Sequence, residues 1–473
     1  MDEYDLIVIG SGPAGEKAAA QAAYFGKSVA LVERGDRLGG APVNSGGIPA
    51  KTLRETALYL TGHRRREMYG VGMELSSEVM LGRLRKRSAE ESERAGESVR
   101  LNLERHGVEV VHGTARLGPD RTVAVSLAAS GTADLRGDVV LIATGSHPFR
   151  PPAIPFDDPD VEDSDSILEL DRIPTSLVVI GGGPVGCEYA SIYAALGVDV
   201  TLIDMADRLL PFLDAEASDQ LARCLQDLGI RVQMGSPAAT VERVDGRLRV
   251  AMGNEIIEPD KVLFVAGRKG NTDGLGLEAA GVELAERGRI VVDDHYRTTA
   301  AGIYAAGDVI GPPALASVSA EQGRVAACHA FDIPFKESVD QLPPFGIYSI
   351  PEVGSVGMTS EQAATEGIDF EIGRYDFSEN PRSRIAGTTY GMIKLVFRRD
   401  DRRLLGVHIV GEEAAELVHI GQAVIHAGGA IDYFIDSTFN IPTRSEAYKY
   451  AAYDGLQRLA RTPAEPPSDA AGG

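Results

Sequence analysis

Two glycine-rich stretches with the same pattern constrain the fold of this chain more than any other feature. Residues 10–15 read Gly-Ser-Gly-Pro-Ala-Gly, residues 181–186 read Gly-Gly-Gly-Pro-Val-Gly, and each follows a short apolar run. The spacing from the first glycine to an acid at the end of the next apolar run is the same in both, Gly10 to Glu33 and Gly181 to Asp204. A strand, this glycine turn, a helix and a strand ending on an acid form the dinucleotide-binding βαβ fingerprint. The repeat therefore predicts two nucleotide-binding units.

A third glycine-rich stretch, residues 39–51 (Gly-Gly-Ala-Pro-Val-Asn-Ser-Gly-Gly-Ile-Pro-Ala-Lys), follows the first fingerprint. Together with that fingerprint it resembles the flavoprotein disulfide reductase family, the relatives of lipoamide dehydrogenase, glutathione reductase and mercuric reductase. In that family the stretch carries two cysteines that take electrons from FAD. The corresponding positions here are Pro42 and Gly47. The resemblance therefore implies the fold and the FAD cofactor, without the dithiol chemistry.

The resemblance implies an α/β fold with two Rossmann-like nucleotide-binding domains and a C-terminal α+β interface domain that makes a homodimer. A chain of 473 residues is too long for a single core, which agrees with several domains. We expect an FAD-binding domain over residues 1–149 with a return segment over 273–342, an NAD(P)-binding domain over 150–272, an interface domain over 343–461 and a disordered tail over 462–473.

In the family, a lysine at the position of Lys51 lies near the flavin N5 and pairs with a glutamate at the position of Glu188. A cation there stabilises the negative charge of the reduced flavin, and a buried lysine stays charged only when it is paired. These two residues are the predicted catalytic pair. Glu33 is expected to bind the adenosine ribose of FAD and Asp308 its ribityl chain. The full predicted FAD set is Gly10, Gly12, Pro13, Ala14, Gly15, Glu33, Arg34, Gly40, Lys51, Ala115, Thr144, Gly145, Asp308 and Ala316.

The second fingerprint is predicted to bind a nicotinamide nucleotide. Asp204 would accept a hydrogen bond from the ribose 2′-hydroxyl of NAD(H) and repel the 2′-phosphate of NADP(H). Taken alone, this acid predicts NAD(H) and leaves the use of NADP(H) open. The predicted residues are Gly181, Gly183, Pro184, Val185, Gly186, Glu188, Asp204 and Gly267.

Without the cysteine pair, a second electron acceptor has to reach the flavin itself. We expect hydride to pass from NAD(P)H via FAD to a second nicotinamide nucleotide, by ping-pong kinetics, as in soluble transhydrogenases. The segments Thr52-Leu53-Arg54, Phe439-Asn440 and 446–456 resemble that subfamily. An NADH-dependent quinone or dye reductase (a diaphorase) remains open, because it explains Asp204 better. A third alternative is a catalytically silent flavoprotein that binds a partner or senses redox state.

The net charge, the N-terminal residues and the cysteines indicate which partners, location and metals to expect. The net charge of −22 argues against nucleic acid or an anionic membrane. The N-terminus has no signal-peptide pattern and no apolar run approaches membrane-spanning length, so we expect a cytoplasmic protein. The three cysteines, Cys187, Cys224 and Cys328, have no metal-ligand spacing and are predicted to be buried free thiols, with no bound metal.

The C-terminal segment departs from the family. The position immediately before Pro442, where disulfide reductases carry a catalytic histidine, is Ile441. No thiol has to be protonated, so the loss of the base agrees with the loss of the cysteines. The residues 443–446 (Thr-Arg-Ser-Glu) fit a capping box, which predicts a structural role for Glu446. His419 and His426 are predicted to be packing or surface residues.

Overall fold

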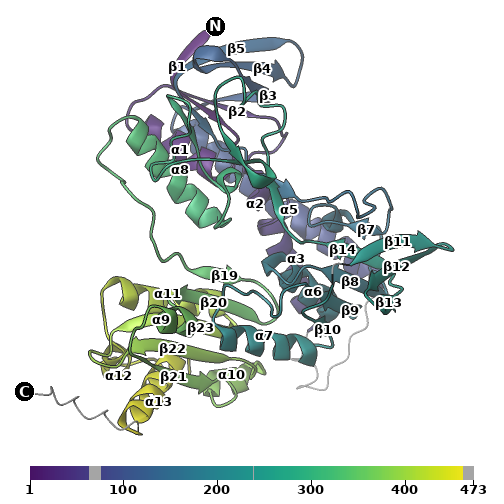
Figure 1. The fold of residues 1–473 in the computed structure, drawn as a ribbon, viewed down its shortest axis with the longest axis vertical. Coiled ribbons are helices and arrows are strands. Elements are labelled where there is room, and N and C mark those ends of the chain that lie inside the picture. Colours follow the sequence, from purple (N-terminus) through teal and green to yellow (C-terminus); the bar gives the residue numbers. More distant parts are fainter. Residues whose placement is uncertain (63–75, 238, 462–473) are drawn as a thin grey trace, which may run out of the picture.

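The computed structural model describes residues 1–62, 76–237 and 239–461, so the tail predicted over 462–473 lies outside the described residues. Figure 1 shows three lobes. The N-terminal lobe, at the top, contains the sheet of β1; the central lobe, at the right, contains the sheet of β8; the C-terminal lobe, at the lower left, contains the sheet of β20.

The N-terminal lobe has a parallel sheet at its centre. Its strands are, in spatial order, β18 (Ile303–Ala305), β5 (Thr132–Ile142), β1 (Asp2–Ile9), β2 (Val29–Glu33) and β3 (Glu109–Leu117). The strand β4 (Thr122–Leu127) pairs antiparallel with the C-terminal half of β3 and with the N-terminal half of β5. Ile7 and Val8 are fully buried, as expected for a parallel sheet that is covered on both faces.

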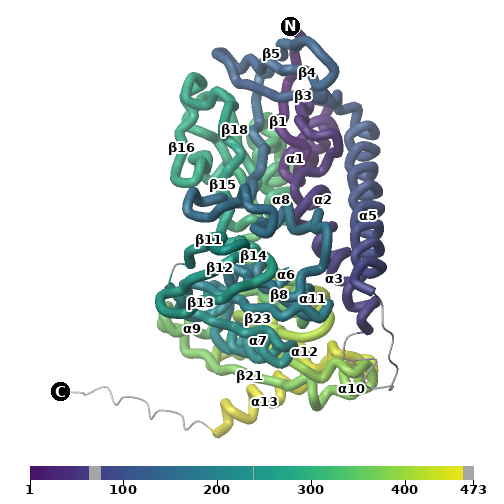
Figure 2. Tube along the Cα trace, turned by 90° about the vertical axis from the view of Figure 1, so that its right-hand side faces the viewer, coloured from purple at the N-terminus to yellow at the C-terminus, as the bar shows by residue number. Residues whose placement is uncertain are grey.

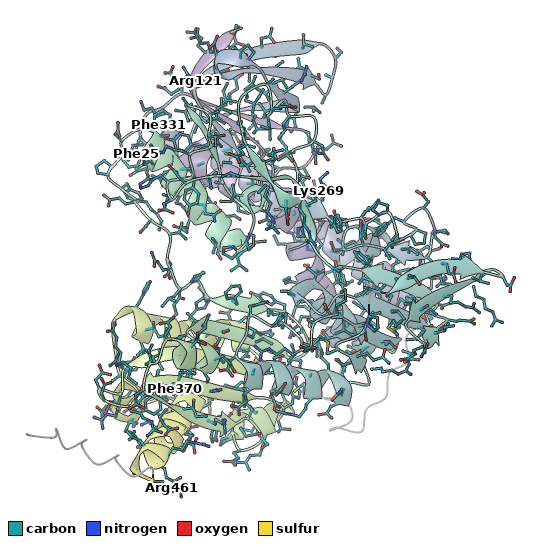
Figure 3. All side chains as sticks on the ribbon, in the orientation of Figure 1. Phe25, Arg121, Lys269, Phe331, Phe370 and Arg461 are labelled. Carbon is teal, nitrogen blue, oxygen red and sulfur yellow. The ribbon has the colours of Figure 1, made fainter. Side chains whose placement is uncertain are left out.

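Helices cover this sheet. Two of them pack together, although one follows the first fingerprint and the other lies about 300 residues later in the chain. The helix α1 (Pro13–Tyr24) packs on α8 (Ala316–Ala330), where a Cβ at Gly323 would lie 2.1 Å from the carbonyl oxygen of Ala14. Their C-terminal ends share one edge of the lobe, where Figure 3 labels Phe25 and Phe331. Figure 2 shows the long helix α5 (Ser77–Arg105) running along the side of the lobe toward α3 (Ile48–Thr61).

The central lobe repeats the same βαβ design. Its parallel strands are ordered β10 (Arg231–Gln233), β9 (Asp199–Ile203), β8 (Ser176–Ile180), β14 (Lys261–Phe264) and β7 (Val161–Glu162), with helices α6 (Pro184–Ala195) and α7 (Ala215–Asp227). A three-stranded antiparallel sheet joins β11 (Thr240–Val244), β12 (Arg247–Met252) and β13 (Glu255–Ile257).

Short elements complete the first two lobes. The strands β6 (Ser146–Pro148) and β15 (Arg268–Gly270) pair antiparallel where the chain passes between these lobes, near the point where Figure 3 labels Lys269. The strands β16 (Leu284–Ala285) and β17 (Arg289–Ile290) form a second small pair. The helix α2 (Gly40–Asn44) precedes α3, and short 3₁₀ turns lie at Pro119–Arg121, Ser166–Glu169, Glu286–Gly288 and Asp308–Ile310.

The C-terminal lobe is an antiparallel sheet with helices against it. Its strands are ordered β19 (Phe345–Ile347), β20 (Glu352–Gly357), β23 (Leu404–Gly411), β22 (Met392–Arg398) and β21 (Phe370–Asp376). The helices are α9 (Ser360–Thr365), α10 (Pro381–Ala386), α11 (Ala414–His426), α12 (Asp432–Asp436) and α13 (Ala447–Arg461). Phe397, Phe434 and Tyr448 fill its core. The α/β fold with two nucleotide-type sheets and a separate C-terminal α+β unit is confirmed.

The predicted capping box at residues 443–446 was wrong. The hydroxyl of Thr443 accepts from the backbone N–H of Ser445 at 3.3 Å, and α13 begins only at Ala447. A threonine hydroxyl that bonds its own backbone two residues on forms a turn, which competes with capping a helix. One carboxylate oxygen of the buried Glu446 accepts from the hydroxyl of Tyr450 at 3.2 Å, and the other has no partner among the described residues.

A buried ion cluster fixes the central lobe to the C-terminal lobe. Asp214 caps α7, and its carboxylate oxygens lie 2.8 and 3.0 Å from Nζ of Lys394 on β22. Both side chains are buried, and Lys394 also lies 3.2 Å from Glu216. Burial alone would raise the pKa of Asp214, but the proximity of His408 and Lys394 and the N–H of Ser360 outweigh burial and lower the pKa to about 2.

We expect Asp214→Asn to remove part of the acid sensitivity of the fold. A carboxyl with a lowered pKa contributes stability above its ordinary pKa, and loses that contribution as pH falls from 3.8 to about 2. The contribution is about 2 kcal/mol. The variant should therefore be less stable than the parent at pH 7 and should lose less stability between pH 4 and pH 2. Urea unfolding midpoints across this pH range measure both effects. An equal loss of stability between pH 4 and pH 2 in the variant and the parent would contradict the prediction.

Candidate active site

The two fingerprint turns have the same backbone geometry. Gly10 and Gly181 take φ values of +104° and +125°, which side-chain-bearing residues rarely adopt. The last glycine of each fingerprint allows close contact between helix and strand. A Cβ at Gly15 would lie 1.9 Å from the carbonyl oxygen of Gly10, and a Cβ at Gly186 would lie 1.7 Å from that of Gly181.

Both helices that follow these turns begin with open backbone donors. The helix α1 begins at Pro13 after Gly12, and α6 begins at Pro184 after Gly183, and neither start has a side-chain cap. Free N–H groups at the positive end of a helix dipole bind phosphate groups. Each turn therefore offers donors that could hold the pyrophosphate of a dinucleotide.

The acid at the end of the second strand of each βαβ unit accepts hydrogen bonds from the fingerprint turn of that unit. The carboxylate of Glu33 accepts from the backbone N–H and hydroxyl of Ser11 at 2.9 and 2.6 Å and from the N–H of Gly35 at 2.8 Å. Asp204 likewise accepts from the N–H groups of Gly182 and Ala206. A carboxylate has about four acceptor sites, so capacity for a ribose hydroxyl remains at both acids.

A cavity of about 1210 Å³ connects residues from all three lobes. Most of the predicted FAD residues line it: Gly10, Gly12, Pro13, Ala14, Glu33, Arg34, Gly40, Lys51, Ala115, Thr144, Gly145, Asp308 and Ala316. The second fingerprint contributes Pro184, Val185 and Glu188. The remaining predicted residues, Gly15, Gly181, Gly183, Gly186, Asp204 and Gly267, are not part of the wall.

Lys51 and Glu188 form an ion pair in the cavity wall. Nζ of Lys51 donates to Oε2 of Glu188 at 2.6 Å. The other oxygen of Glu188 accepts from the backbone N–H of Tyr348 at 3.0 Å, and the ring centroid of Tyr348 lies 5.1 Å from the ammonium. Glu188 exposes only 8% of its side chain and Lys51 exposes 31%. The carboxylate is thus held inside the protein while the ammonium faces the cavity.

The polar groups around the cavity fit a dinucleotide cofactor. The hydroxyl oxygen of Thr144 is buried and has no hydrogen-bond partner among the described residues, although Thr144 lines the cavity. Asp308 lies in the same wall, where its carboxylate accepts from Ser146 at 3.0 Å and Ser319 at 3.4 Å. A buried hydroxyl without a partner is costly in a folded protein, and a bound ligand would remove that cost.

No sulfur lies at the positions where the family carries its cysteines. Pro42 and Gly47 both line the cavity, and a Cβ at Gly47 would lie 2.5 Å from the backbone oxygen of Pro42. The three cysteines are buried free thiols elsewhere, as predicted. Burial is the main reason that the pKa of the Cys187 thiol is raised, which disfavours its reactive thiolate form.

The C-terminal lobe contributes residues to this cavity that could not be predicted from the sequence. Tyr348 contacts both members of the ion pair, and His419 and Gln422 of α11 line the same wall, with Nδ1 of His419 2.9 Å from Oε1 of Gln422. His419 is exposed, as predicted for a surface residue, and it also lines the cavity. His426 is largely exposed, as predicted. Helical spacing places these residues on α11, but it does not tell which other lobe that helix faces.

None of the helices described is long and apolar enough to cross a membrane. Within residues 1–62, 76–237 and 239–461, no group of three or more His, Cys, Asp or Glu side chains is placed to hold a metal ion.

Comparisons with known proteins agree with this geometry. The family model described as pyridine nucleotide-disulphide oxidoreductase matches residues 4–323, and the model of the dimerisation domain of such proteins matches residues 343–452. A soluble pyridine nucleotide transhydrogenase from Mycobacterium tuberculosis is 45% identical over 461 residues, which cover 97% of this chain and 98% of that protein. One from Pseudomonas aeruginosa is 39% identical over 464 residues, covering 96% and 99%.

A solved structure extends the likeness to three dimensions. The HOCl-induced flavoprotein disulfide reductase RclA from Escherichia coli matches with a TM-score of 0.85 and 28% identity over 95% of this chain and 99% of that chain. The predicted family resemblance is therefore confirmed. The chain belongs to the pyridine nucleotide-disulphide oxidoreductase family, with proline and glycine at the positions of the redox cysteines.

Proposed function

We propose that the protein is a flavin-dependent transhydrogenase that passes hydride from NAD(P)H to a second nicotinamide nucleotide. The observation that carries this proposal is the Lys51–Glu188 pair in the wall of a cavity that no cysteine of the described residues lines. The full-length identity of 45% to proteins named soluble pyridine nucleotide transhydrogenase supports it. FAD, when bound, supplies a ring that accepts hydride from one nicotinamide and gives it to the next.

The residues of this chain bind and orient the two nucleotides. The first fingerprint, with Glu33 and Asp308, would hold FAD, and the second fingerprint, with Asp204, would hold the nicotinamide nucleotide. Lys51 would place a positive charge beside the position where hydride arrives, and Glu188 would fix the direction of that ammonium. We also propose that the chain acts as a cytoplasmic homodimer joined through the C-terminal lobe, which contains the matched dimerisation domain.

A quinone reductase is the second candidate function, and two observations favour it. Asp204 disfavours the 2′-phosphate that a transhydrogenase using both nucleotides has to accept. His419 places a titratable group in the cavity wall. The two reactions differ in their proton balance. NADH plus NADP⁺ gives NAD⁺ plus NADPH without a proton, whereas NADH plus a quinone takes up one proton to give NAD⁺ and the hydroquinone.

The experiment that separates the two functions begins with holoenzyme reduced by NADH under anaerobic conditions. It measures the re-oxidation of the flavin. The reduced protein is mixed with thio-NAD⁺, NADP⁺ or a soluble quinone in weak buffer, and flavin absorbance and a pH indicator are recorded together. We expect the nicotinamides to restore the flavin colour within one turnover time and without proton uptake. Recovery with the quinone alone, with uptake of one proton, would support the second candidate. A flavin that NADH fails to reduce would indicate a catalytically silent flavoprotein.

Asp204→Asn is expected to shift the nucleotide preference toward NADPH. It is also expected to weaken the binding of both nucleotides. Loss of the negative charge removes the repulsion of the 2′-phosphate. However, both carboxylate oxygens of Asp204 accept backbone N–H groups, and an amide offers only one acceptor oxygen. We therefore expect the ratio of kcat/KM for NADPH to that for NADH to rise while kcat/KM for NADH falls. Steady-state kinetics with both nucleotides test this, and an unchanged ratio would show that Asp204 does not face the ribose.

A further inference from the structure

Two helices that are far apart in the sequence but pack on each other, α3 and α6, each present a pair of polar residues one turn apart. On α3 the pair is Lys51 and Arg54, and on α6 it is Glu188 and Ser191. Residues three apart on a helix lie on the same face. The first members of the two pairs bond each other, Lys51 to Glu188 at 2.6 Å. The second members, Arg54 and Ser191, both bond the same segment of the C-terminal lobe.

That segment, Tyr348 to Ile350, is held by three hydrogen bonds from three consecutive residues. The N–H of Tyr348 donates to Glu188, the carbonyl of Ser349 accepts from Nε of Arg54, and the N–H of Ile350 donates to Ser191, each at 3.0 Å. Because Tyr348 also lies against the Lys51 ammonium, any shift of this segment displaces the groups around the ion pair.

Arg54 is the charged member of this arrangement and is itself buried, with 4% of its side chain exposed. Its Nη1 lies 3.3 Å from Glu352, whose pKa is raised by burial against the opposing effect of Arg54. The second oxygen of Glu352 accepts from the N–H of Ala415 at 3.2 Å, at the start of α11. Arg54 thus links α3 both to the Tyr348 segment and to the helix that carries His419.

We propose that Arg54 is a positioning residue for hydride transfer, acting through Tyr348 and Glu188 on the Lys51 ammonium. The inference rests on the proposed function only in assigning Lys51 to the reductive step. Arg54 does not line the cavity itself. Its guanidinium holds the Tyr348 segment at the distance where the N–H of Tyr348 bonds Glu188 and the ring of Tyr348 lies against Lys51.

The test combines Arg54→Gln with Lys51→Met. We expect Arg54→Gln alone to lower the rate constant of flavin reduction by NADH about tenfold, the factor that 1.4 kcal/mol represents, with little change in the Kd for NADH. The double variant should be no slower than Lys51→Met alone, because residues acting through one group are not additive. Arg54→Lys should recover part of the rate. Hydrogen–deuterium exchange of the amides of Tyr348 and Ile350 should increase in Arg54→Gln.

Arg444→Gln is the matched control. Arg444 is equally buried, at 4%, but its guanidinium bonds Glu413 at 2.7 Å and Thr388 at 2.8 Å instead of the Tyr348 segment. This variant should reduce its flavin at the parent rate. If Arg54→Gln does not fold, Ser191→Ala removes another bond to the segment without stranding a charge and should show the same non-additivity. The proposal would be overturned if the rate losses of the two single variants multiplied in the double variant. It would also be overturned if hydrogen–deuterium exchange of the Tyr348 amide were unchanged in Arg54→Gln. A failed transhydrogenase function would instead appear in the re-oxidation of the parent protein.

Discussion

Replacing Lys51 by methionine is expected to slow the reduction of bound flavin by NADH about 10²–10³-fold, equivalent to about 2.7–4 kcal/mol. Methionine has a similar length and no charge, so the cavity keeps its shape while the ammonium disappears. The substitution also leaves the largely buried Glu188 without its cation. Leaving one partner of an inward-facing ion pair alone is far more damaging than removing both. The measurement is anaerobic stopped-flow absorbance of the flavin after mixing with NADH.

Two further variants separate charge from geometry at this pair. Lys51→Arg keeps the positive charge but changes its shape, and should retain more of the rate than Lys51→Met. Glu188→Gln keeps an acceptor for the N–H of Tyr348 while removing the negative charge, so its loss should be smaller than that of Lys51→Met. All three variants should purify with bound flavin, because none alters a fingerprint turn. A parent-like rate in Lys51→Met would place Lys51 away from the reacting ring.

Features that depend on neighbouring residues could be predicted from the sequence. The apolar runs predicted to end at the acids Glu33 and Asp204 form the strands β2, Val29–Glu33, and β9, Asp199–Ile203. Both fingerprint turns have the positive φ at the first glycine that the pattern requires. These features succeed because apolar runs, glycine turns and helix starts act over a few residues.

Features that depend on long-range contacts could not be predicted. The bond from Arg54 to Ser349 joins residues 295 positions apart, and no local pattern specifies such a partner. For the same reason Tyr348 and His419 were missed as residues of the cavity wall. The pairing of Lys51 with Glu188 was expected only through the family resemblance. The capping box failed for a local reason, because a Thr hydroxyl has several backbone groups within reach.

The assignment of FAD to the first fingerprint and of the nicotinamide nucleotide to the second predicts different losses for two equivalent substitutions. In Gly15→Ala the new methyl group would lie 1.9 Å from the oxygen of Gly10, so α1 has to move away from its turn. In Gly186→Ala the corresponding distance to Gly181 is 1.7 Å, and α6 has to move. Overpacking of this kind costs about 1–3 kcal/mol, or about 5–150-fold in binding.

We expect Gly15→Ala to purify with little flavin, and Gly186→Ala to keep its flavin while its reduction by NADH requires about 5–150-fold more nucleotide. Flavin absorbance per protein and the NADH dependence of bleaching measure the two losses. Gly82→Ala is the control, since a Cβ at Gly82 of α5 meets nothing within 4 Å. The opposite outcome, flavin lost from Gly186→Ala and kept by Gly15→Ala, would exchange the two nucleotide assignments. Equal flavin loss in both would mean that the two turns do not act as separate sites, and the path of hydride from one nucleotide to the next would then have to be redrawn.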